Sequence, residues 1–509
     1  MPRLGSYHPD ELLIISAASI VDFGSLQLNP QFYNYPSLFI YVISLVFSVL
    51  EGWGLLATGE IAVLYLSARM ISAVFGAATI YMVFLAGKRF YGEAAGLIAA
   101  GVLAIMPLHV QHSHFVAVDV PSVFFLTAAL GASVLLLRDR RMRVFILAGV
   151  LSGLAAGTKY NCGLIFASVI AAGLLSAKPE DSAALGIRQR IAPIGVAFLA
   201  AVAAFLLVTP GAILWTSQFL HGLTYELRHV ATGHGYVFVN TGPGWLYTIT
   251  SSLNHGLGWP LLLISLLSVI MAIARRRRED LIVLAFIVPY FVLISLSEVR
   301  FARYALPLLP PLAILTAGAV MDIRQRLRSR PKIRGMAAVG LGLVLLYTLT
   351  YSIALNSLFT QPDPRDRVAD WAQDYLPEGT TIAFPTVPWF YSPPFAPGFG
   401  NLRADDRFDA MAESRYNLVA DRSSDWNAEL LREKLPEYVM ISDYEKTDAL
   451  RADAPGARRY MRAVEELHEP VAVFQSRFRP AIFGSVSALP HDMQYPAPKI
   501  EVYRIKWQR

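Results

Sequence analysis

Two neighbouring carboxylates, Asp10 and Glu11, lie close to the start of the chain in the stretch Tyr7-His8-Pro9-Asp10-Glu11. Both are ionised at neutral pH, and a positioned carboxylate can accept the proton of a hydroxyl group that attacks a reacting carbon. Asp is also a favoured N-cap residue, so Asp10 has the alternative role of capping a helix that begins near Glu11. The pair is a candidate for base catalysis on a substrate held at a membrane surface.

Three cations stand in loops that are otherwise poor in positive charge. Lys159 lies in the tight connection Gly157-Thr158-Lys159-Tyr160-Asn161, and Arg300 and Arg303 follow at helical i, i+3 spacing, so they can share a face. The planar guanidinium group matches the oxygens of a phosphate. The alternatives are lipid headgroup contacts for the arginines and a snorkelling side chain for Lys159. The pattern favours a phosphate site.

The elements that must position these residues are membrane helices. The chain has 509 residues, 55% of them hydrophobic and 16% charged, with a mean hydropathy of +0.45. This composition indicates a polytopic membrane protein. Ten apolar runs have about the length that spans a bilayer. They lie near 66–87, 94–112, 119–137, 144–158, 160–177, 191–213, 256–274, 281–297, 303–321 and 335–358.

The basic residues in the loops predict the orientation. One set of alternate loops holds nineteen Lys and Arg, whereas the intervening loops hold four. Because cytoplasmic loops carry the excess of Lys and Arg, the first set is cytoplasmic and the second faces outward. These clusters are ordinary anchors of membrane helices and do not indicate nucleic-acid binding. For Asp10 to face outward, the apolar stretch 36–57 must lie along the outer interface and not cross the membrane.

Residues 359–509 have a different composition, with many charges and few long apolar runs, which predicts a soluble outward α/β domain. Helices are expected at 366–376 and 427–435, and strands at 380–384, 438–442, 472–478 and 500–505. The predicted division is therefore an outward first loop with juxtamembrane helices at 1–65, a transmembrane bundle at 66–358 and a soluble domain at 359–509. The single cysteine, Cys162, excludes a disulfide framework.

Six short motifs form a spaced set along residues 7–310. They are Tyr7–Glu11, Tyr35–Leu38, Lys88–Gly92, Pro107–Pro121 with His109, His114 and Asp119, Thr158–Tyr160, and Arg303–Tyr304 with Pro307 and Pro310. Together they resemble the polyprenyl-phosphate-sugar glycosyltransferases of the C-type fold. That family includes the dolichyl-phosphate-mannose protein mannosyltransferases and the bacterial aminoarabinose transferase of lipid A.

The resemblance implies an integral glycosyltransferase of the plasma membrane, with its active site and C-terminal domain on the extracytoplasmic side. Such an enzyme transfers a hexosyl or pentosyl group from a polyprenyl-phosphate donor to a lipid, glycan or protein acceptor. The roles implied are catalysis for Asp10 and Glu11, donor phosphate binding for Arg300, Arg303, Lys159 and Tyr304, and substrate positioning for His8, Tyr35, His109, His114 and Asp119. Asp119, at a predicted helix start, has capping as its alternative.

Metal dependence is left open by the resemblance, because members with and without a metal share this layout. His112, His114 and Asp119 lack a convincing ligand spacing, so we expect no metal or other cofactor, with a divalent ion as the alternative. The rival function is a transporter, flippase or binding protein for lipid-linked sugars. Inverted repeats of broken helices would favour transport, and none is apparent in the sequence.

The family usually has a transmembrane helix before its first outward loop, and the resemblance here begins within that loop. We therefore expect the upstream genomic sequence to encode an in-frame apolar segment of about 20 residues.

Overall fold

The computed structural model describes residues 6–55, 61–176, 187–396 and 404–506. The chain folds as two compact units. We call Leu13–Ala231 with Pro243–Ile353 the bundle unit, and Met1–Leu12 with Thr232–Gly242 and Ala354–Arg509 the C-terminal unit. This division differs from the three parts expected from the sequence, because the residues around Asp10 and a short segment after residue 231 fold with the C-terminal residues.

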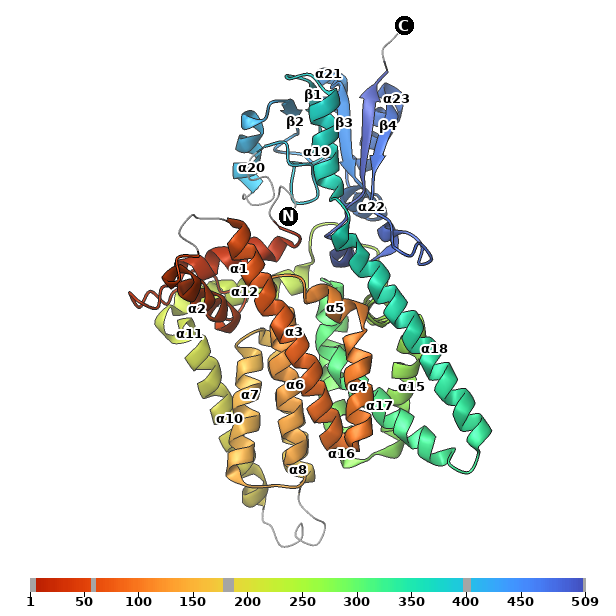
Figure 1. Ribbon diagram of the computed structural model, residues 1–509. Coiled ribbons are helices and arrows are strands. Elements are labelled where there is room, and N and C mark those ends of the chain that lie inside the picture. The colour runs from red at the N-terminus through yellow and green to blue at the C-terminus, as the bar shows by residue number, and fades with distance from the viewer. Residues whose placement is uncertain (1–5, 56–60, 177–186, 397–403, 507–509) are drawn as a thin grey trace. The chain divides into compact units, whose positions relative to one another are not determined.

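The bundle unit is helical, and each of the ten predicted apolar ranges falls on a helix or on two consecutive helices (Figure 1). The helices that match the ten ranges are α3 (Ile61–Tyr91), α4 (Glu93–Ala104) with α5 (Pro107–His112), α6 (Asp119–Leu135), α7 (Met142–Ala156), η1 (Tyr160–Ile165) with α8 (Phe166–Leu175), α10 (Ile187–Val208), α15 (Trp259–Arg275), α16 (Arg278–Ser295), η3 (Ala302–Leu308) with α17 (Leu309–Arg326), and α18 (Pro331–Asn356).

By length and hydropathy, four helices of the described chain can each cross a membrane, or five when α15 is joined to the helical turns before it across a 118° bend. Five further apolar helices are shorter, with 10–17 residues. The short ones arise where the sequence interrupts a run, as at Pro107, which starts α5 after α4 has ended. The protein is a multi-pass helical membrane protein with a C-terminal α/β domain, as predicted.

Small residues allow neighbouring helices to approach closely. On α7, a Cβ atom at Gly149 would lie 2.1 Å from the Ala197 carbonyl oxygen of α10, and one at Gly153 would lie 2.2 Å from the Ala201 carbonyl oxygen. Glycines four residues apart occupy one helix face, so this stripe lets the two backbones pack without intervening side chains. The contact fixes α7, which leads into the segment that carries Lys159.

Two helices and a loop cover one end of the bundle unit. α2 (Leu38–Gly52) lies beside the start of α3, at the same end as α12 (Thr216–Thr232), and does not run along the long helices (Figure 1). Tyr33 is held between two glycines, since a Cβ at Gly211 or Gly222 would lie 2.2 Å or 2.5 Å from its atoms. The amphipathic pattern of residues 216–232 forms α12.

The helices that follow α12 are short and precede α15. They are α13 (Gly244–Tyr247), η2 (Thr248–Leu253) and α14 (Asn254–Leu257), and α11 (Gly211–Leu214) precedes α12. Gly258, with φ at +81°, separates α14 from α15. A residue with side chain rarely adopts this conformation, so the glycine permits the sharp bend between them.

The C-terminal domain contains a five-stranded sheet in the order β2-β1-β3-β5-β4. The strands are β1 (Thr381–Ala383), β2 (Asn417–Val419), β3 (Tyr438–Ser442), β4 (His468–Phe474) and β5 (Ile500–Ile505). β2, β1 and β3 pair in parallel, and β5 pairs antiparallel with both β3 and β4. The strand expected at 472–478 begins and ends four residues earlier, because His468 pairs with Ile505 at the end of β5.

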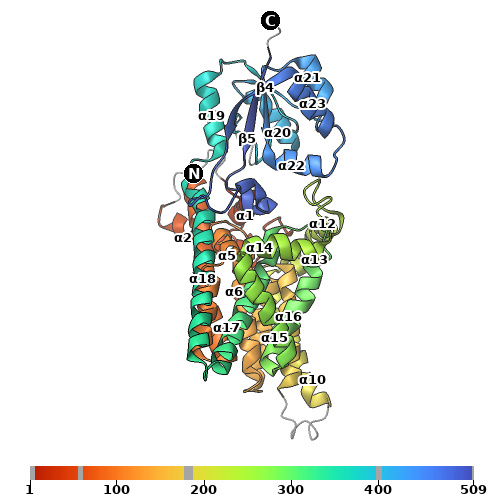
Figure 2. The same ribbon diagram turned by 90° about the vertical axis from the view of Figure 1, so that its right-hand side faces the viewer.

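Helices cover both faces of this sheet (Figure 2). α19 (Pro364–Tyr375) packs on the face that carries Met440, whereas α21 (Ala428–Lys434), α22 (Asp443–Arg451) and α23 (Ala457–Leu467) pack on the face with Val439 and Ile441. Alternating residues of β3 thus enter opposite cores. The short α20 (Ala404–Ala410) precedes β2.

The predicted orientation of the two units in the membrane is testable by labelling. A cysteine replacing exposed Ser423 should react with an impermeant maleimide added to intact cells, and one replacing exposed Ser329 should not. The reason is the charge bias of the loops. Native Cys162 is buried and should give little background. External labelling at position 329 in intact cells would reverse the predicted orientation.

Candidate functional site

A buried ion pair lies inside the bundle unit. Lys159 Nζ is 2.6 Å from Asp119 Oδ1, and the two side chains are 9% and 2% exposed. Asp119 is the first residue of α6 and Lys159 directly precedes η1. The starts of two helices therefore meet at this point. Burying an ion costs several kcal/mol unless it is paired. Asp119 therefore compensates the charge of Lys159 and fixes the position of its ammonium group.

Two residues of η3, Arg303 and Tyr304, lie close to this ion pair. The Lys159 ammonium lies 4.8 Å from the centroid of the Tyr304 ring, and the Arg303 guanidinium carbon lies 5.8 Å from it. Arg303 is 5% exposed and also lies 4.0 Å from the Phe301 ring centroid. Such distances suit cation–π interactions, which are strengthened by burial. We call Asp119, Lys159, Arg303 and Tyr304 the buried cationic cluster.

The electrostatic balance of the buried cationic cluster is positive. Arg303 and His112 both interact electrostatically with the Asp119 carboxylate, in addition to Lys159. One carboxylate thus faces two permanent cations. The cluster carries a surplus of one positive charge in a largely buried place, where an anion would be bound strongly.

Hydrogen bonds that run through a tyrosine of α16 fix the backbone of η3. Asn161 Nδ2 donates to Tyr290 Oη over 3.3 Å, and Tyr290 Oη donates to the Tyr304 carbonyl oxygen over 3.1 Å. Tyr290 is fully buried in α16. The sequence does not mark Tyr290 as a site residue, because a tyrosine within an apolar run has the same pattern as an aromatic residue of the core. Figure 1 shows α5 and the start of α6 at the same end of the bundle unit as α2 and α12.

The other predicted site residues of the bundle unit make local contacts. Arg300 Nε donates to the Ser297 carbonyl oxygen over 3.3 Å, and its Nη2 lies 3.5 Å from the Glu298 carboxylate. His114 is exposed, and its Nδ1 lies 2.8 Å from the Val110 carbonyl oxygen. Arg300 and His114 thus interact with their own loops, and their predicted roles in phosphate binding and substrate positioning stay predictions.

His109 and Tyr35 pack within the bundle unit. His109 is buried, with Nε2 3.3 Å from the Gly76 carbonyl oxygen, so it connects α5 to α3. Tyr35 makes an edge contact with Phe32, with ring centroids 5.9 Å apart, in the loop before α2. These contacts stabilise the end of the bundle, and the substrate-positioning roles predicted for both residues stay predictions.

The acidic pair lies in the C-terminal unit, at the start of α1 (Pro9–Ile20). The Glu11 carboxylate is buried and accepts hydrogen bonds from the Tyr7 N–H over 2.8 Å and from Ser6 Oγ over 3.1 Å. Asp10 is the second residue of the helix, and its side chain is 14% exposed. The helix therefore begins before Asp10, and it is Glu11 that satisfies donors of the preceding turn.

The side chains of Asp10 and Glu11 have different surroundings. Its carboxylate is occupied by the turn that leads into the helix, whereas Asp10 keeps an accessible part of its side chain. A catalytic base must reach a substrate proton. Glu11 thus holds the turn in position, and the catalytic roles expected for Glu11 and Asp10 stay predictions.

Aromatic residues of the C-terminal unit hold the same turn. The buried His8 ring makes an edge contact with Tyr495, with centroids 4.8 Å apart, and the Tyr7 ring contacts Phe359 at 5.5 Å. Tyr495 in turn contacts Phe390 at 5.6 Å. His8, expected to position a substrate, thus anchors the Asp10 turn, and any direct role in substrate contact stays a prediction.

In the described part of the chain, no three His, Cys, Asp or Glu side chains come together in a group that could hold a metal ion. Asp119 is paired with Lys159, and the Glu11 carboxylate accepts hydrogen bonds within its turn.

Comparison with known proteins gives one family match. Residues 36–215 match the family model described as dolichyl-phosphate-mannose-protein mannosyltransferase. The matched segment contains Asp119 and Lys159, and it excludes Asp10 and η3. The match confirms the resemblance inferred from the motifs. It identifies the enzyme class as a glycosyltransferase and leaves the transferred sugar open.

No curated protein matches the chain. Solved structures with similarity include the archaeal oligosaccharyltransferase AglB from Archaeoglobus fulgidus in complex with an inhibitory peptide and a dolichol-phosphate, at 14% identity over 91% of this chain and 68% of that chain, with a TM-score of 0.48. ArnT from Cupriavidus metallidurans bound to undecaprenyl phosphate is 14% identical over 99% of this chain and 93% of that chain, with a TM-score of 0.44. Arabinofuranosyltransferase AftD from Mycobacteria is 15% identical over 99% of this chain and 38% of that chain, with a TM-score of 0.36.

Proposed function

We propose that the protein transfers a sugar from a polyprenyl-phosphate donor to a lipid, glycan or protein acceptor on the extracytoplasmic side of the plasma membrane. The observation that carries the proposal is the buried cationic cluster, whose two key residues Asp119 and Lys159 lie inside the matched family segment. The donor is a phosphodiester with one negative charge. That charge equals the surplus of the cluster, so a donor phosphate would neutralise it.

The cluster also suits the leaving group of the reaction. When the bond between the anomeric carbon and the phosphate oxygen breaks, the oxygen takes the electron pair and the lipid phosphate becomes a monoester with a second negative charge. Lys159 and Arg303 are held in place before the reaction by Asp119 and by the aromatic rings of Tyr304 and Phe301. Preorganised cations of this kind stabilise charge as it develops in the transition state.

Asp10 is assigned the role of general base. Its carboxylate would accept the proton of the acceptor hydroxyl as the hydroxyl oxygen attacks the anomeric carbon. The support is its partly exposed side chain at the start of α1 and its place in the acidic motif that resembles the family. Glu11 and His8 hold the turn that presents it.

The proposal is tested by the fate of the donor. Purified protein in liposomes should convert a polyprenyl-phosphate sugar into free polyprenyl phosphate and a glycosylated acceptor, resolved by chromatography of the lipid fraction. A flippase or binding protein would return the donor intact. An unchanged donor in the presence of acceptor-containing membrane extract would therefore refute the transferase assignment.

Tyr495 offers a test of how the Asp10 turn is positioned. Tyr495→Ala removes the ring against His8 and should lower turnover by about 10- to 100-fold with little change in donor KM, because misplacing a catalytic group by about 1 Å has effects of this size. Tyr495→Phe keeps the ring and should restore turnover. Equal turnover of a folded Tyr495→Ala protein would show that the contact does not position the base.

A further inference from the structure

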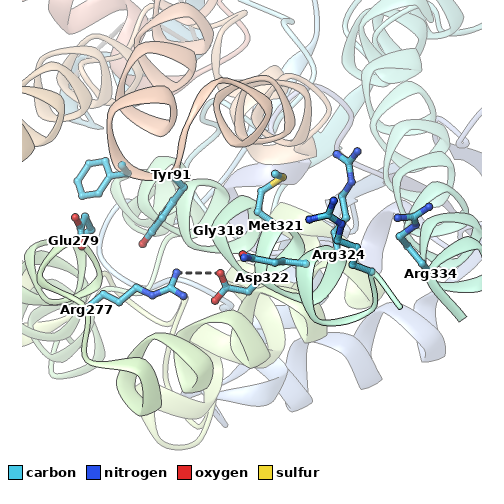
Figure 3. Close-up of a pocket in the computed structure, with 11 residues that line it drawn as sticks. Tyr91, Arg277, Glu279, Gly318, Met321, Asp322, Arg324 and Arg334 are labelled. Carbon is cyan, nitrogen blue, oxygen red and sulfur yellow. Dashed lines mark hydrogen bonds and ion pairs between the residues drawn. The ribbon is translucent and has the colours of Figure 1, made fainter. Parts of the chain in front are cut away.

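A pocket lies beside the last residues of α3. This end of the bundle unit is the one opposite α2 and α12 (Figure 1). The pocket has a volume of about 610 Å³ and is lined by the ends of α3, α16, α17 and α18 (Figure 3). The lining side chains come from the last residues of α3, the first of α16, the second half of α17 and the start of α18. Four are arginines and two are acids, which gives a surplus of two positive charges.

Part of the polar lining is already neutralised. The Arg277 guanidinium lies 3.0 Å from the Asp322 carboxylate, and Arg275, behind the pocket, lies 2.8 Å from the same carboxylate. Arg275 also lies 3.1 Å from Asp280, which accepts a hydrogen bond from the Tyr91 hydroxyl. This network fixes the side of the pocket formed by Arg277 and Asp322. The surplus positive charge therefore lies on the other arginines that line the pocket.

Three arginines carry the surplus charge. Arg324, Arg328 and Arg334 line the pocket with exposed side chains, and none of them forms a salt bridge with another described residue. Arg324 and Arg328 are four residues apart on α17 and therefore share a face. Figure 3 shows Arg324 and Arg334 on one side of the pocket and the pair Arg277–Asp322 on the other.

The helix next to these arginines presents an apolar surface. Residues 331–340 of α18 are all exposed, and the apolar side chains continue along the helix: Ile333, Met336, Val339 and Leu343 are 46%, 73%, 64% and 62% exposed. In a membrane-spanning helix, a surface of this kind is covered by acyl chains. The positive pocket thus continues into a lipid-facing surface.

We propose that this pocket binds the headgroup of an anionic lipid that carries two phosphate charges, with its acyl chains lying along α18. The surplus of two positive charges matches such a headgroup, and guanidinium groups bind phosphate oxygens in a planar fork. Basic pockets between membrane helices suit phosphate-bearing lipid headgroups. The proposal does not depend on the proposed function, since it concerns the opposite end of the bundle unit.

Native mass spectrometry of the full chain in detergent tests the proposal. The protein should bind diphosphatidylglycerol, which has two phosphodiesters, more tightly than phosphatidylglycerol, which has one, and should bind phosphatidylcholine weakest. Arg324→Gln combined with Arg328→Gln should weaken diphosphatidylglycerol binding at least about tenfold, since each contact to a charged group is worth about that factor or more.

The matched control is Arg326→Gln combined with Arg330→Gln, which removes the same charge from neighbouring exposed positions that do not line the pocket. It should bind the lipid as the parent does. Equal weakening in both double variants would overturn the proposal, because the attraction would then depend on net charge alone. Displacement of the lipid by equimolar inorganic pyrophosphate would overturn it in favour of a soluble anion, and a dimer broken by the pocket variant would overturn it in favour of a second copy of the chain.

Discussion

Replacing Asp10 with Asn should slow sugar transfer by on the order of 10² to 10⁴, the usual contribution of a general base. Asn is nearly isosteric with Asp but cannot take the proton of the acceptor hydroxyl at neutral pH. Donor binding should remain at the parental level, because the phosphate is assigned to Lys159 and Arg303. The measurement is the initial rate of polyprenyl phosphate release in liposomes, together with the donor dissociation constant.

The structure separates this prediction from a helix-capping effect. α1 begins at Pro9, so Asp10 lies inside the first turn, and the turn before the helix is satisfied by the Glu11 carboxylate. Asp10→Asn should therefore leave the thermal stability unchanged. Asp409→Asn is the matched control, since Asp409 is 70% exposed in the C-terminal domain. A parental transfer rate in the Asp10→Asn protein would remove Asp10 from the mechanism.

Replacing Lys159 with Met should both destabilise the bundle unit and strongly slow transfer. The change leaves the Asp119 carboxylate buried without its partner at 2.6 Å, and breaking a buried ion pair from one side costs about 3 to 5 kcal/mol of unfolding free energy. Loss of the cation also removes stabilisation of the leaving phosphate, which is worth about 10² to 10³ in turnover. Thermal denaturation in detergent and the transfer assay measure the two effects.

A double variant separates the two effects. Lys159→Met with Asp119→Asn removes both charges, so much of the lost stability should return while transfer stays low. This result would show that Lys159 acts on the donor phosphate beyond its structural pairing. Parental turnover in the stable double variant would instead mean that the ion pair serves packing alone.

The sequence predicted the bundle because apolar runs of membrane-spanning length have few alternative structures. It also identified Lys159, Arg303 and Asp119, since charged residues in otherwise uncharged loops are conspicuous. It did not predict that Lys159 and Asp119 pair with each other, because 40 positions separate them and their meeting depends on how α6 and η1 pack. Position in the sequence contains no direct information on such a contact.

Residues that look alike in the sequence differ in their surroundings in the structure. Asp10 and Glu11 look equivalent in sequence, and the direction of the first turn of α1 decides that Glu11 faces inward to accept the Tyr7 N–H. Arg300 and Arg303 also look equivalent, yet η3 buries Arg303 against Phe301, whereas Arg300 contacts Ser297 and Glu298. In both cases the local path of the backbone decides which side chain faces the interior.

The stereochemistry of the product tests the central claim most directly. Direct displacement of the lipid phosphate by an activated acceptor hydroxyl, as proposed above, inverts the anomeric carbon. A route through a covalent glycosyl-enzyme retains its configuration, as the two classes of glycosidase show. The anomeric configuration of the transferred sugar, read by NMR and compared with that of the donor, should therefore be inverted, and a retained configuration would contradict the mechanism.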